Sequence, residues 1–447
     1  MKKSKNILVV FSAIIFGLAL SGCQNPFLQL GKEAISSASS PFVQSPIPGA
    51  VVYQDGTEEY PFLVYDVETL GMVGSGKTLD GINYWNLDQQ YIQIENIDLS
   101  DEDDWQPIGL GSQFSGSYKG NGHSISNLSM SGVDYIGLFS KIDVFGKVVG
   151  IRLIDATIEG SRNVGGIAGR NDGEILDCSF TGRISTTDKH LGGMAGWNLG
   201  TVERCSAEGH FNGTESIGGM VGSSDGKVIN CYAVGNFNGN YFIGGIAGQN
   251  SAQGQILGCY AAGSFSDTYD IGGIAGYDIG GIAGLSRGSV KNCYSTGTCG
   301  SAASTNVGGL VGLIGDGELA SSYSTCEIQG ADIIGGLAGS ISKGQIRDCA
   351  ALSDSVTSPS VNVGRITGDY ASGYTSIQNN YASLGGMDAI ISSHLEMDGI
   401  DVAESDWIYE SWWTTFADWS SDDAWDFETI WEWGLDDLPI LRGVGGQ

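Results

Sequence analysis

The chain is poor in basic residues and in histidine. Its 447 residues include 21 Lys and Arg against 51 Asp and Glu, a formal net charge of −30. Because so acidic a surface repels phosphate backbones, we expect no nucleic-acid partner. Zinc sites need several ligands close together, and the 4 histidines are scattered, so no metal site is predicted. The histidines are His123, His190, His210 and His394.

Proline and long apolar runs are also scarce. With 8 Pro beside 71 Gly, the chain does not have the composition of collagen. One apolar run, Ile7–Leu20, follows Lys2, Lys3 and Lys5. It is short for a membrane span and has the layout of a secretory signal, and no second run of spanning length follows. The sequence therefore predicts an exported protein.

Features expected of an enzyme are sparse. The sequence contains no His-Glu-x-x-His pattern, and its many Gly-x-x-Gly strings are interpreted as repeat backbone. Enzymes that cleave polysaccharides need outward carboxylates about 5–9 Å apart in a cleft. Here the predicted turns are short and basic residues are few. We therefore predict no catalytic residue and no cofactor.

What the chain does have is a repeated phrase, Val-Gly-Gly-Ile-Ala-Gly, at Val164–Gly169. Apart from one step of 8 residues, successive variants begin 26 to 29 residues apart. Such a period indicates one supersecondary unit stacked many times, each needing its neighbours to bury its apolar face. The variants begin at Ile136, Val164, Leu191, Ile217, Ile243, Ile271, Ile279, Val307, Ile334 and Val363.

Aligned repeats place the same residue types in columns. A turn glycine is followed two residues later by an aliphatic residue and five residues later by Cys in most repeats. An odd separation of three cannot point both side chains inward along a straight strand, so a corner must lie between them. Asn, Asp and Gly tolerate the left-handed backbone of such corners. The expected corners are Asp177, Asn230, Gly258, Asn292 and Asp348, and the cysteines are Cys178, Cys205, Cys231, Cys259, Cys293 and Cys349.

These columns predict an all-β fold, a right-handed parallel β-helix with about three short strands per coil. A β-propeller fits less well, because its blades take roughly 40–50 residues. The cysteines of the column should be free thiols. Cys299 and Cys326 stand in other columns, and neither has an obvious partner. Tyr269–Gly276 and Tyr277–Gly284 are identical, so one copy should leave the stack.

Two kinds of segment resemble known families. Gly166–Gly169, Gly193–Gly196 and Gly309–Gly312 resemble the GLUG motif, which implies a bacterial surface or adhesin-like protein and brings no catalytic residue. Leu20-Ser21-Gly22-Cys23 resembles the lipobox of bacterial lipoproteins. That resemblance implies cleavage before Cys23 and a membrane partner held through lipid on Cys23. In that family, a residue other than Asp after the cysteine leans towards the outer membrane, so with Gln24 the resemblance implies the outer membrane or cell surface.

The expected organisation has five parts. Residues 1–22 form the signal peptide, 23–48 a lipid anchor and flexible tether, and 49–104 an N-terminal cap and first coils. Residues 105–380 form the GLUG-type β-helix, and 381–447 a Trp-rich C-terminal cap. Within the N-terminal cap, Asp66 is expected to begin a short helix, Val67–Met72, over the first coil.

Two aromatic groups are candidate binding residues. One is a stripe that follows the Cys column and serves either as a stacking ladder or as an adhesive surface. The other lies in the C-terminal segment, which either stacks on sugars or shields the end of the last coil. The residues are Tyr232, Tyr260, Tyr294 and Tyr323 for the stripe, and Trp412, Trp413 and Trp419 for sugar stacking.

The function that these observations favour is a non-catalytic, lipid-anchored surface scaffold or adhesin-like binding protein. Its partner would be an unknown host or cell-surface protein or glycan. The alternative is a polysaccharide-active or polysaccharide-binding β-helix protein, because fold alone does not decide function.

Overall fold

The computed structural model describes residues 42–44, 51–267, 277–384, 395–420 and 425–445. The chain divides into two compact units. In the smaller unit, β1 (Phe42–Gln44) pairs antiparallel with β2 (Val51–Tyr53). β1 lies within the segment expected to be a tether. The signal segment and Cys23 lie outside the described residues.

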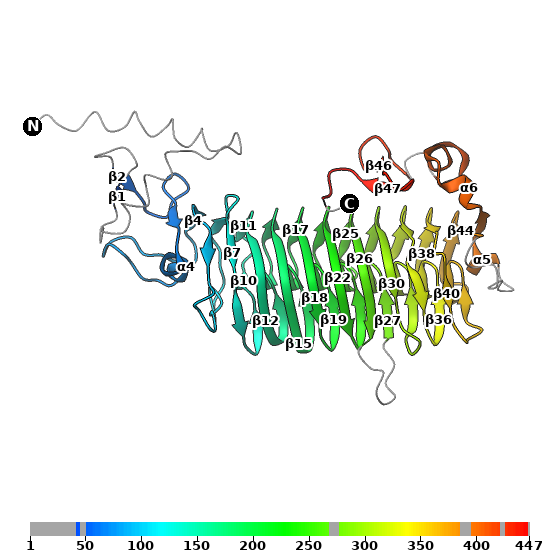
Figure 1. The fold of residues 1–447 in the computed structure, drawn as a ribbon, viewed down its shortest axis with the longest axis horizontal. Coiled ribbons are helices and arrows are strands. Elements are labelled where there is room, and N and C mark those ends of the chain that lie inside the picture. The colour runs from blue at the N-terminus through cyan, green and yellow to red at the C-terminus, as the bar shows by residue number, and fades with distance from the viewer. Residues whose placement is uncertain (1–41, 45–50, 268–276, 385–394, 421–424, 446–447) are drawn as a thin grey trace, which may run out of the picture. The chain divides into compact units, whose positions relative to one another are not determined.

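The larger unit, residues 56–77 and 85–447, is a parallel β-helix, as the column pattern predicts (Figure 1). One coil consists of β16 (Ala195–Asn198), β17 (Thr201–Glu203), β18 (Ser206–Asn212) and β19 (Glu215–Gly218). Each strand pairs in parallel with its counterparts in the preceding and following coils. Three walls result, which we number in the order of β16, β17 and β18 in this coil.

The first wall is a sheet of nine strands, and the second wall a sheet of twelve. Besides β16, the first wall holds β10 (Phe139–Ile142), β13 (Ala168–Asn171), β20 (Val221–Ser224), β24 (Ala247–Asn250), β28 (Ala283–Ser286), β32 (Val311–Ile314), β37 (Ala338–Ile341) and β42 (Thr367–Tyr370). Besides β17, the second wall holds β3 (Phe62–Val64), β4 (Gln90–Gln93), β6 (Ser117–Lys119), β11 (Lys147–Val149), β14 (Glu174–Leu176), β21 (Lys227–Ile229), β25 (Gln255–Leu257), β29 (Ser289–Lys291), β33 (Glu318–Ala320), β38 (Gly344–Arg347) and β43 (Thr375–Gln378).

The third wall differs from the single short strand per coil that we expected. In two early coils it is one long strand, β12 (Arg152–Gly165) or β15 (Ser179–Gly192), and in later coils it is two or three shorter strands. The later strands are β22 (Tyr232–Gly239), β23 (Tyr241–Gly244), β26 (Tyr260–Asp267), β27 (Tyr277–Gly280), β30 (Tyr294–Cys299), β31 (Thr305–Gly308), β34 (Tyr323–Ser324), β35 (Glu327–Gln329), β36 (Asp332–Gly335), β39 (Ala350–Ala351), β40 (Val356–Thr357), β41 (Val363–Gly364), β44 (Tyr381–Ser383) and β45 (Ile400–Val402). The first coils contribute β5 (Ile97–Asp98), β7 (Ser124–Ser126), β8 (Ser129–Ser131) and β9 (Asp134–Ile136).

The predicted corners between the second and third walls are confirmed. Asp177, Asn230, Gly258, Asn292 and Asp348 all have φ between 52° and 61°. A second column of left-handed residues, which we did not predict, lies just before the repeated phrase in eight successive coils. Its members are Tyr135, Asn163, His190, Ser216, Phe242, Asp278, Asn306 and Ile333.

The interior is filled by stacked columns of apolar side chains. Phe211 lies over Phe237 and Phe237 over Phe265, with ring centroids 4.9 and 5.0 Å apart. All cysteines among the described residues are buried free thiols, as predicted. Cys299 and Cys326, for which the sequence offered no partner, are neighbours: burial and a hydrogen bond with Cys326 raise the pKa of the Cys299 thiol.

Register settles which copy of the duplicated octapeptide lies in the stack. Tyr241 pairs with Tyr277 and Ile243 with Ile279, so the second copy, Tyr277–Gly284, supplies the coil. The first copy, Tyr269–Gly276, lies outside the described residues.

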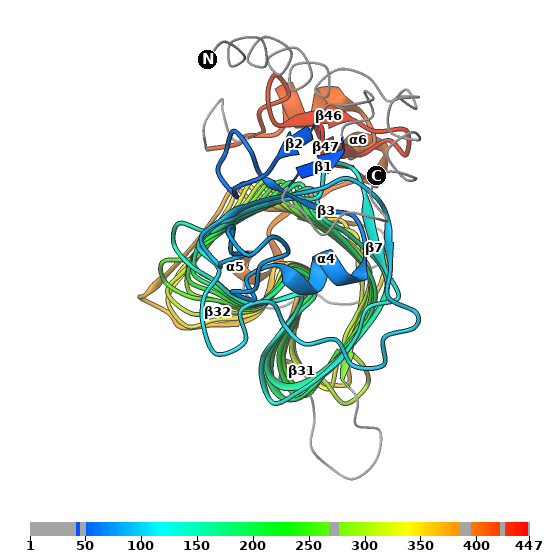
Figure 2. The same ribbon diagram turned by 90° about the vertical axis from the view of Figure 1, so that its left-hand side faces the viewer.

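Short helices close the ends of the stack. Helix α4 (Val67–Met72) begins at Asp66, whose carboxylate accepts a hydrogen bond from the Thr69 backbone at 2.8 Å, as predicted. It lies across the N-terminal opening of the coils, and its Leu70 belongs to their core (Figure 2). At the other end, the carbonyl of Met397 in α5 (Leu395–Asp398) accepts a hydrogen bond from the Ile366 N–H at 2.8 Å. None of the helices in the described residues is long and apolar enough to span a membrane.

Candidate functional site

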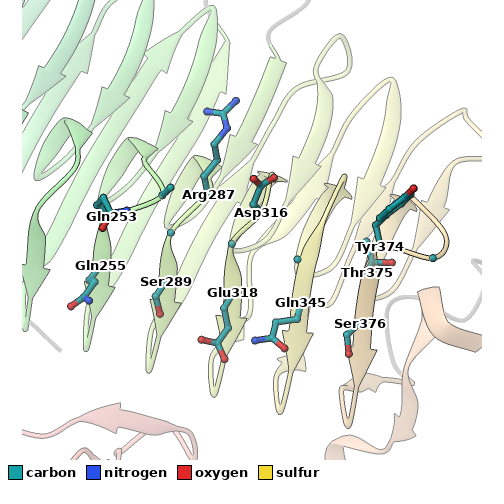
Figure 3. Close-up of a pocket in the computed structure, with 16 residues that line it drawn as sticks. Gln253, Gln255, Arg287, Ser289, Asp316, Glu318, Gln345, Tyr374, Thr375 and Ser376 are labelled. Carbon is teal, nitrogen blue, oxygen red and sulfur yellow. The ribbon is translucent and has the colours of Figure 1, made fainter.

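A groove of about 580 Å³ crosses successive coils where the first wall turns into the second. The first row of side chains that line it comes from the starts of second-wall strands. In each strand it is the first residue that points outward, and these residues pair in register from coil to coil. A second row comes from the turns that precede these strands (Figure 3). The first row is Gln255, Ser289, Glu318, Gln345 and Ser376, and the second is Gln253, Arg287, Asp316 and Tyr374.

Between the two rows the lining includes a column of turn glycines, Gly254, Gly288, Gly317 and Gly344. A Cβ at Gly288 would lie 2.1 Å from the Gly254 carbonyl oxygen, and one at Gly317 would lie 2.4 Å from that of Gly288. The close stacking of these coils therefore requires glycine here. The consequence is a floor without side chains between two polar rows.

A longer turn stands at each end of the groove along the stack. The turn Ser251–Gly254 at one end and the turn Ala371–Tyr374 at the other are longer than Arg287–Gly288 between them. Each long turn is closed by its own backbone: Gly254 N–H donates to Ser251 O at 2.8 Å, and Tyr374 N–H donates to Ala371 O at 3.4 Å. The floor is thus framed by two ordered turns.

The charges in the groove are largely compensated. Lys291 Nζ lies 2.6 Å from Glu318 Oε2, and Arg347 Nη2 lies 2.8 Å from Glu318 Oε1. Burial alone would raise the pKa of Glu318, but hydrogen bonds from Lys291 and Arg347 outweigh it and hold the pKa below its usual range. Arg287 and Asp316 are both exposed and opposite in sign. The groove therefore offers amides, hydroxyls and a balanced set of charges.

The four tyrosines of the predicted stripe stack face to face, as the ladder interpretation expects. Their ring centroids are 5.0 to 5.2 Å apart and their planes within 6°. However, Tyr260, Tyr294 and Tyr323 are buried, and only Tyr232 is partly exposed. The C-terminal segment covers them: Tyr260 and Tyr323 donate hydrogen bonds to the carbonyls of Gly445 and Pro439. Three of the four rings are therefore covered, which disagrees with the alternative interpretation of the stripe as an adhesive surface.

The tryptophans likewise face protein. Trp413 contacts Tyr323, and both Trp412 and Trp419 contact Tyr381. Trp412 and Trp413 are buried and Trp419 is half-buried, so these sugar-stacking candidates do not form an open platform in this structure.

The position of the Trp-rich segment also needs correction. We expected it to cover the end of the last coil. Instead it runs back along the outside of the stack (Figure 1), while Met397 and β45 cover the end. The segment contains α6 (Glu404–Trp407), a π-helical turn (Trp412–Phe416), β46 (Trp431–Trp433) and β47 (Pro439–Leu441).

Three short strings match functional patterns that we did not predict as sites. Gly222–Gly226 and Gly284–Gly288 fit Gly-x-Ser-x-Gly, but their Ser224 and Ser286 are buried and accept hydrogen bonds from interior asparagine amides. Gly71–Thr78 fits the pattern of phosphate-binding loops. Such a loop precedes a helix, whereas Gly71 and Met72 end α4. The structural context that each pattern needs is therefore missing.

Comparison with known proteins identifies the repeat. Residues 160–185 match the family model of the GLUG motif. A stretch of 144 residues is 31% identical to halomucin of Haloquadratum walsbyi (strain DSM 16790 / HBSQ001) and covers 30% of this chain. The chain matches only 2% of the length of halomucin.

Two solved structures also resemble the chain. A protein from Bacteroides ovatus proposed to be an immunoglobulin A1 protease is 19% identical, with a TM-score of 0.39, over 87% of this chain and 94% of that one. An IgA1 protease structure is 13% identical, with a TM-score of 0.32, over 72% of this chain and 21% of that one.

The segment matched by the GLUG model is one turn of the stack. It spans the end of β12 and the start of β15, including the Gly-Gly phrase at Val164–Gly169. Later coils repeat this phrase in register, since Val164 pairs with Leu191 and Leu191 with Ile217. Residues 160–185 are thus similar to the GLUG motif, and neighbouring coils repeat the same phrase in register.

Proposed function

We propose that this protein is exported to the cell surface and acts there as a non-catalytic scaffold that binds an extended ligand in the coil groove. The observation that carries the proposal is the groove itself, two polar rows over a glycine floor, framed by two ordered turns. The backbone of this groove is already formed without a ligand, so binding does not require the coils to fold.

The amino-terminal sequence supports the location. A basic start, an apolar run and Cys23 have the layout of a lipoprotein signal, and lipid on Cys23 would tether the chain to a membrane. GLUG-motif repeats are also typical of bacterial surface proteins. The formal charge of −30 keeps such a repetitive surface soluble and disfavours polyanionic partners.

The test compares two variants that add the same bulky side chain to the same column. Ser289→Trp places an indole in the groove, and Thr201→Trp places it at the equivalent position three coils earlier, outside the groove. On glycan and matrix-protein arrays, we expect S289W to lose the binding shown by the wild-type chain and T201W to keep it. Circular dichroism checks that both variants fold. Equal binding by S289W and the wild type would contradict the proposal.

A second candidate function is cleavage of a bound polymer. The observation that favours it is the presence of two carboxylates, Asp316 and Glu318, in the groove. A general acid needs a raised pKa, whereas that of Glu318 is lowered, so binding is the better-supported role. Release of reducing ends from a polysaccharide panel by the wild type, and its loss in Asp316→Asn, would favour the enzyme instead.

A further inference from the structure

We infer that the groove binds a neutral, linear glycan whose chain runs along the stack, perpendicular to the strands. This inference rests on the proposed function and names the ligand class of the same groove. Three features carry it: the repetition of the groove, its chemistry and one exposed aromatic ring.

The repetition of the groove calls for a ligand that repeats. Gln255, Ser289, Glu318 and Gln345 pair in register, so equivalent side chains recur at about the 4.8 Å spacing of neighbouring strands. A linear glycan presents hydroxyl groups at a regular interval along its length and can contact several coils in the same way. The side-chain-free floor lets flat sugar rings approach the backbone.

The chemistry of the two rows fits hydroxyl groups. Gln253, Gln255 and Gln345 each carry a donor and an acceptor, and Ser289 and Ser376 carry hydroxyls that do both. The negative charge of Glu318 is compensated by Lys291 and Arg347 at 2.6 and 2.8 Å. A neutral ligand therefore meets hydrogen-bonding partners without the repulsion that a polyanion would meet from this acidic chain.

Tyr374 provides an apolar platform at one end of the groove. Its side chain is 73% exposed, although tyrosine is large enough to bury much apolar area. Its turn is ordered, because Thr375 Oγ1 donates to Ala371 O at 3.2 Å and Gly344 N–H donates to Tyr374 O at 3.4 Å. An exposed aromatic face beside amide and hydroxyl groups suits the apolar face of a sugar ring.

A peptide ligand fits this groove less well. Extended peptides add to the open edge of a sheet, where backbone groups are unpaired. In the groove, β29 and β33 are each paired on both sides, and the groove crosses them instead of following an edge. A peptide there would have no backbone ladder to join.

The test measures binding of the full chain by calorimetry to neutral probes, namely β-1,4-linked gluco- and xylo-oligosaccharides and α-1,4-linked malto-oligosaccharides. Polygalacturonate and an unstructured polar peptide serve as the anionic and peptide probes. We expect at least one neutral series to bind, with affinity that rises with chain length and changes little with salt. We expect Tyr374→Ala, and separately the Gln255→Ala/Gln345→Ala double variant, to weaken binding by about tenfold or more.

Two control variants and the S289W result separate the possible outcomes. Tyr409→Ala removes another exposed tyrosine, and Thr201→Ala shortens the same column outside the groove, so both should bind as the wild type does. Suppose that the wild type binds only polygalacturonate or the peptide and that S289W loses this binding. The neutral-glycan inference is then wrong and the proposed function stands. Binding of neutral probes that Y374A and the double glutamine variant leave unchanged would also overturn the inference. If S289W binds like the wild type, the proposed function fails with it.

Discussion

The residues at the left-handed corners differ in how well they tolerate positive φ and burial. Asn163 and Asn306 stand in the unpredicted column before the Gly-Gly phrase, where asparagine tolerates positive φ. Asp278 occupies the same column with φ 59° and is buried. Burial raises the pKa of Asp278 to about 6, against the lowering effects of the hydrogen bond from Asn306 and the charge of Arg287. An ionised carboxylate is therefore poorly accommodated at this corner.

Replacing Asp278 by Asn should stabilise the fold near neutral pH. The pKa of Asp278 is raised in the folded state. The contribution of Asp278 to stability is therefore full below about pH 3.8 and is lost as pH rises through about 6. At pH 7 the wild type carries the buried charge, and D278N removes it while keeping an oxygen for the Asn306 amide. We expect a gain on the order of 2 kcal/mol at pH 7 that nearly vanishes at pH 4.

Urea unfolding at the two pH values measures this difference. Asp316→Asn, at an exposed turn, is the control and should change stability little at either pH. A D278N variant that is less stable than the wild type at pH 7, or shifted equally at both pH values, would show that the charge is not the cause.

Among the elements, the C-terminal segment is held to the outer side of the stack by specific contacts as well as by ring packing. Ser420 N–H donates to Asp348 Oδ1 at 2.6 Å, and Trp425 Nε1 donates to the Asp348 carbonyl at 3.1 Å. Asp348 is a corner residue and is fully buried beneath the segment. The segment therefore makes the tyrosine ladder part of a second core, separate from the interior of the coils.

Removing one hydroxyl beneath this segment should lower the stability of the protein. Tyr323 is 2% exposed and donates to the Pro439 carbonyl at 2.7 Å, so Tyr323→Phe leaves that carbonyl without this donor. We expect a loss of about 1–2 kcal/mol in thermal or urea unfolding followed by tryptophan fluorescence. Tyr409→Phe, where the ring is 61% exposed, should have little effect. Unchanged stability in Y323F would mean that the segment is not held at this point.

For the whole molecule, the sequence predicts the repeating part of the fold and fails where repetition stops. The 26–29-residue period, the Cys column and the Asn and Asp corners follow from backbone geometry that every coil shares. The N-terminal helix was also predictable, because Asp66 and Thr69 form a local capping pattern. The second corner column was missed because Tyr135, Phe242 and Ile333 carry no left-handed preference of their own.

The binding groove and the C-terminal segment depend on long-range arrangement. Tryptophan packs on any apolar surface, so composition alone did not tell that Trp413 and Trp431 cover the side of the stack instead of its end. The groove had a sequence signal that we did not use: the turn before Gln255 is longer than the turn before Ser289. Variation in turn length at one corner of a solenoid marks where a surface hollow can form.

The central claim is that ligand binds across the coils between the two long turns. Hydrogen–deuterium exchange of the full chain, with and without a mixture of neutral linear oligosaccharides, tests it most directly. The account predicts that protection on binding is concentrated in the turns Ser251–Gly254 and Ala371–Tyr374 and in the turns between them. Protection confined to Trp412–Trp433, or to the first coils, would contradict it and place the binding surface elsewhere.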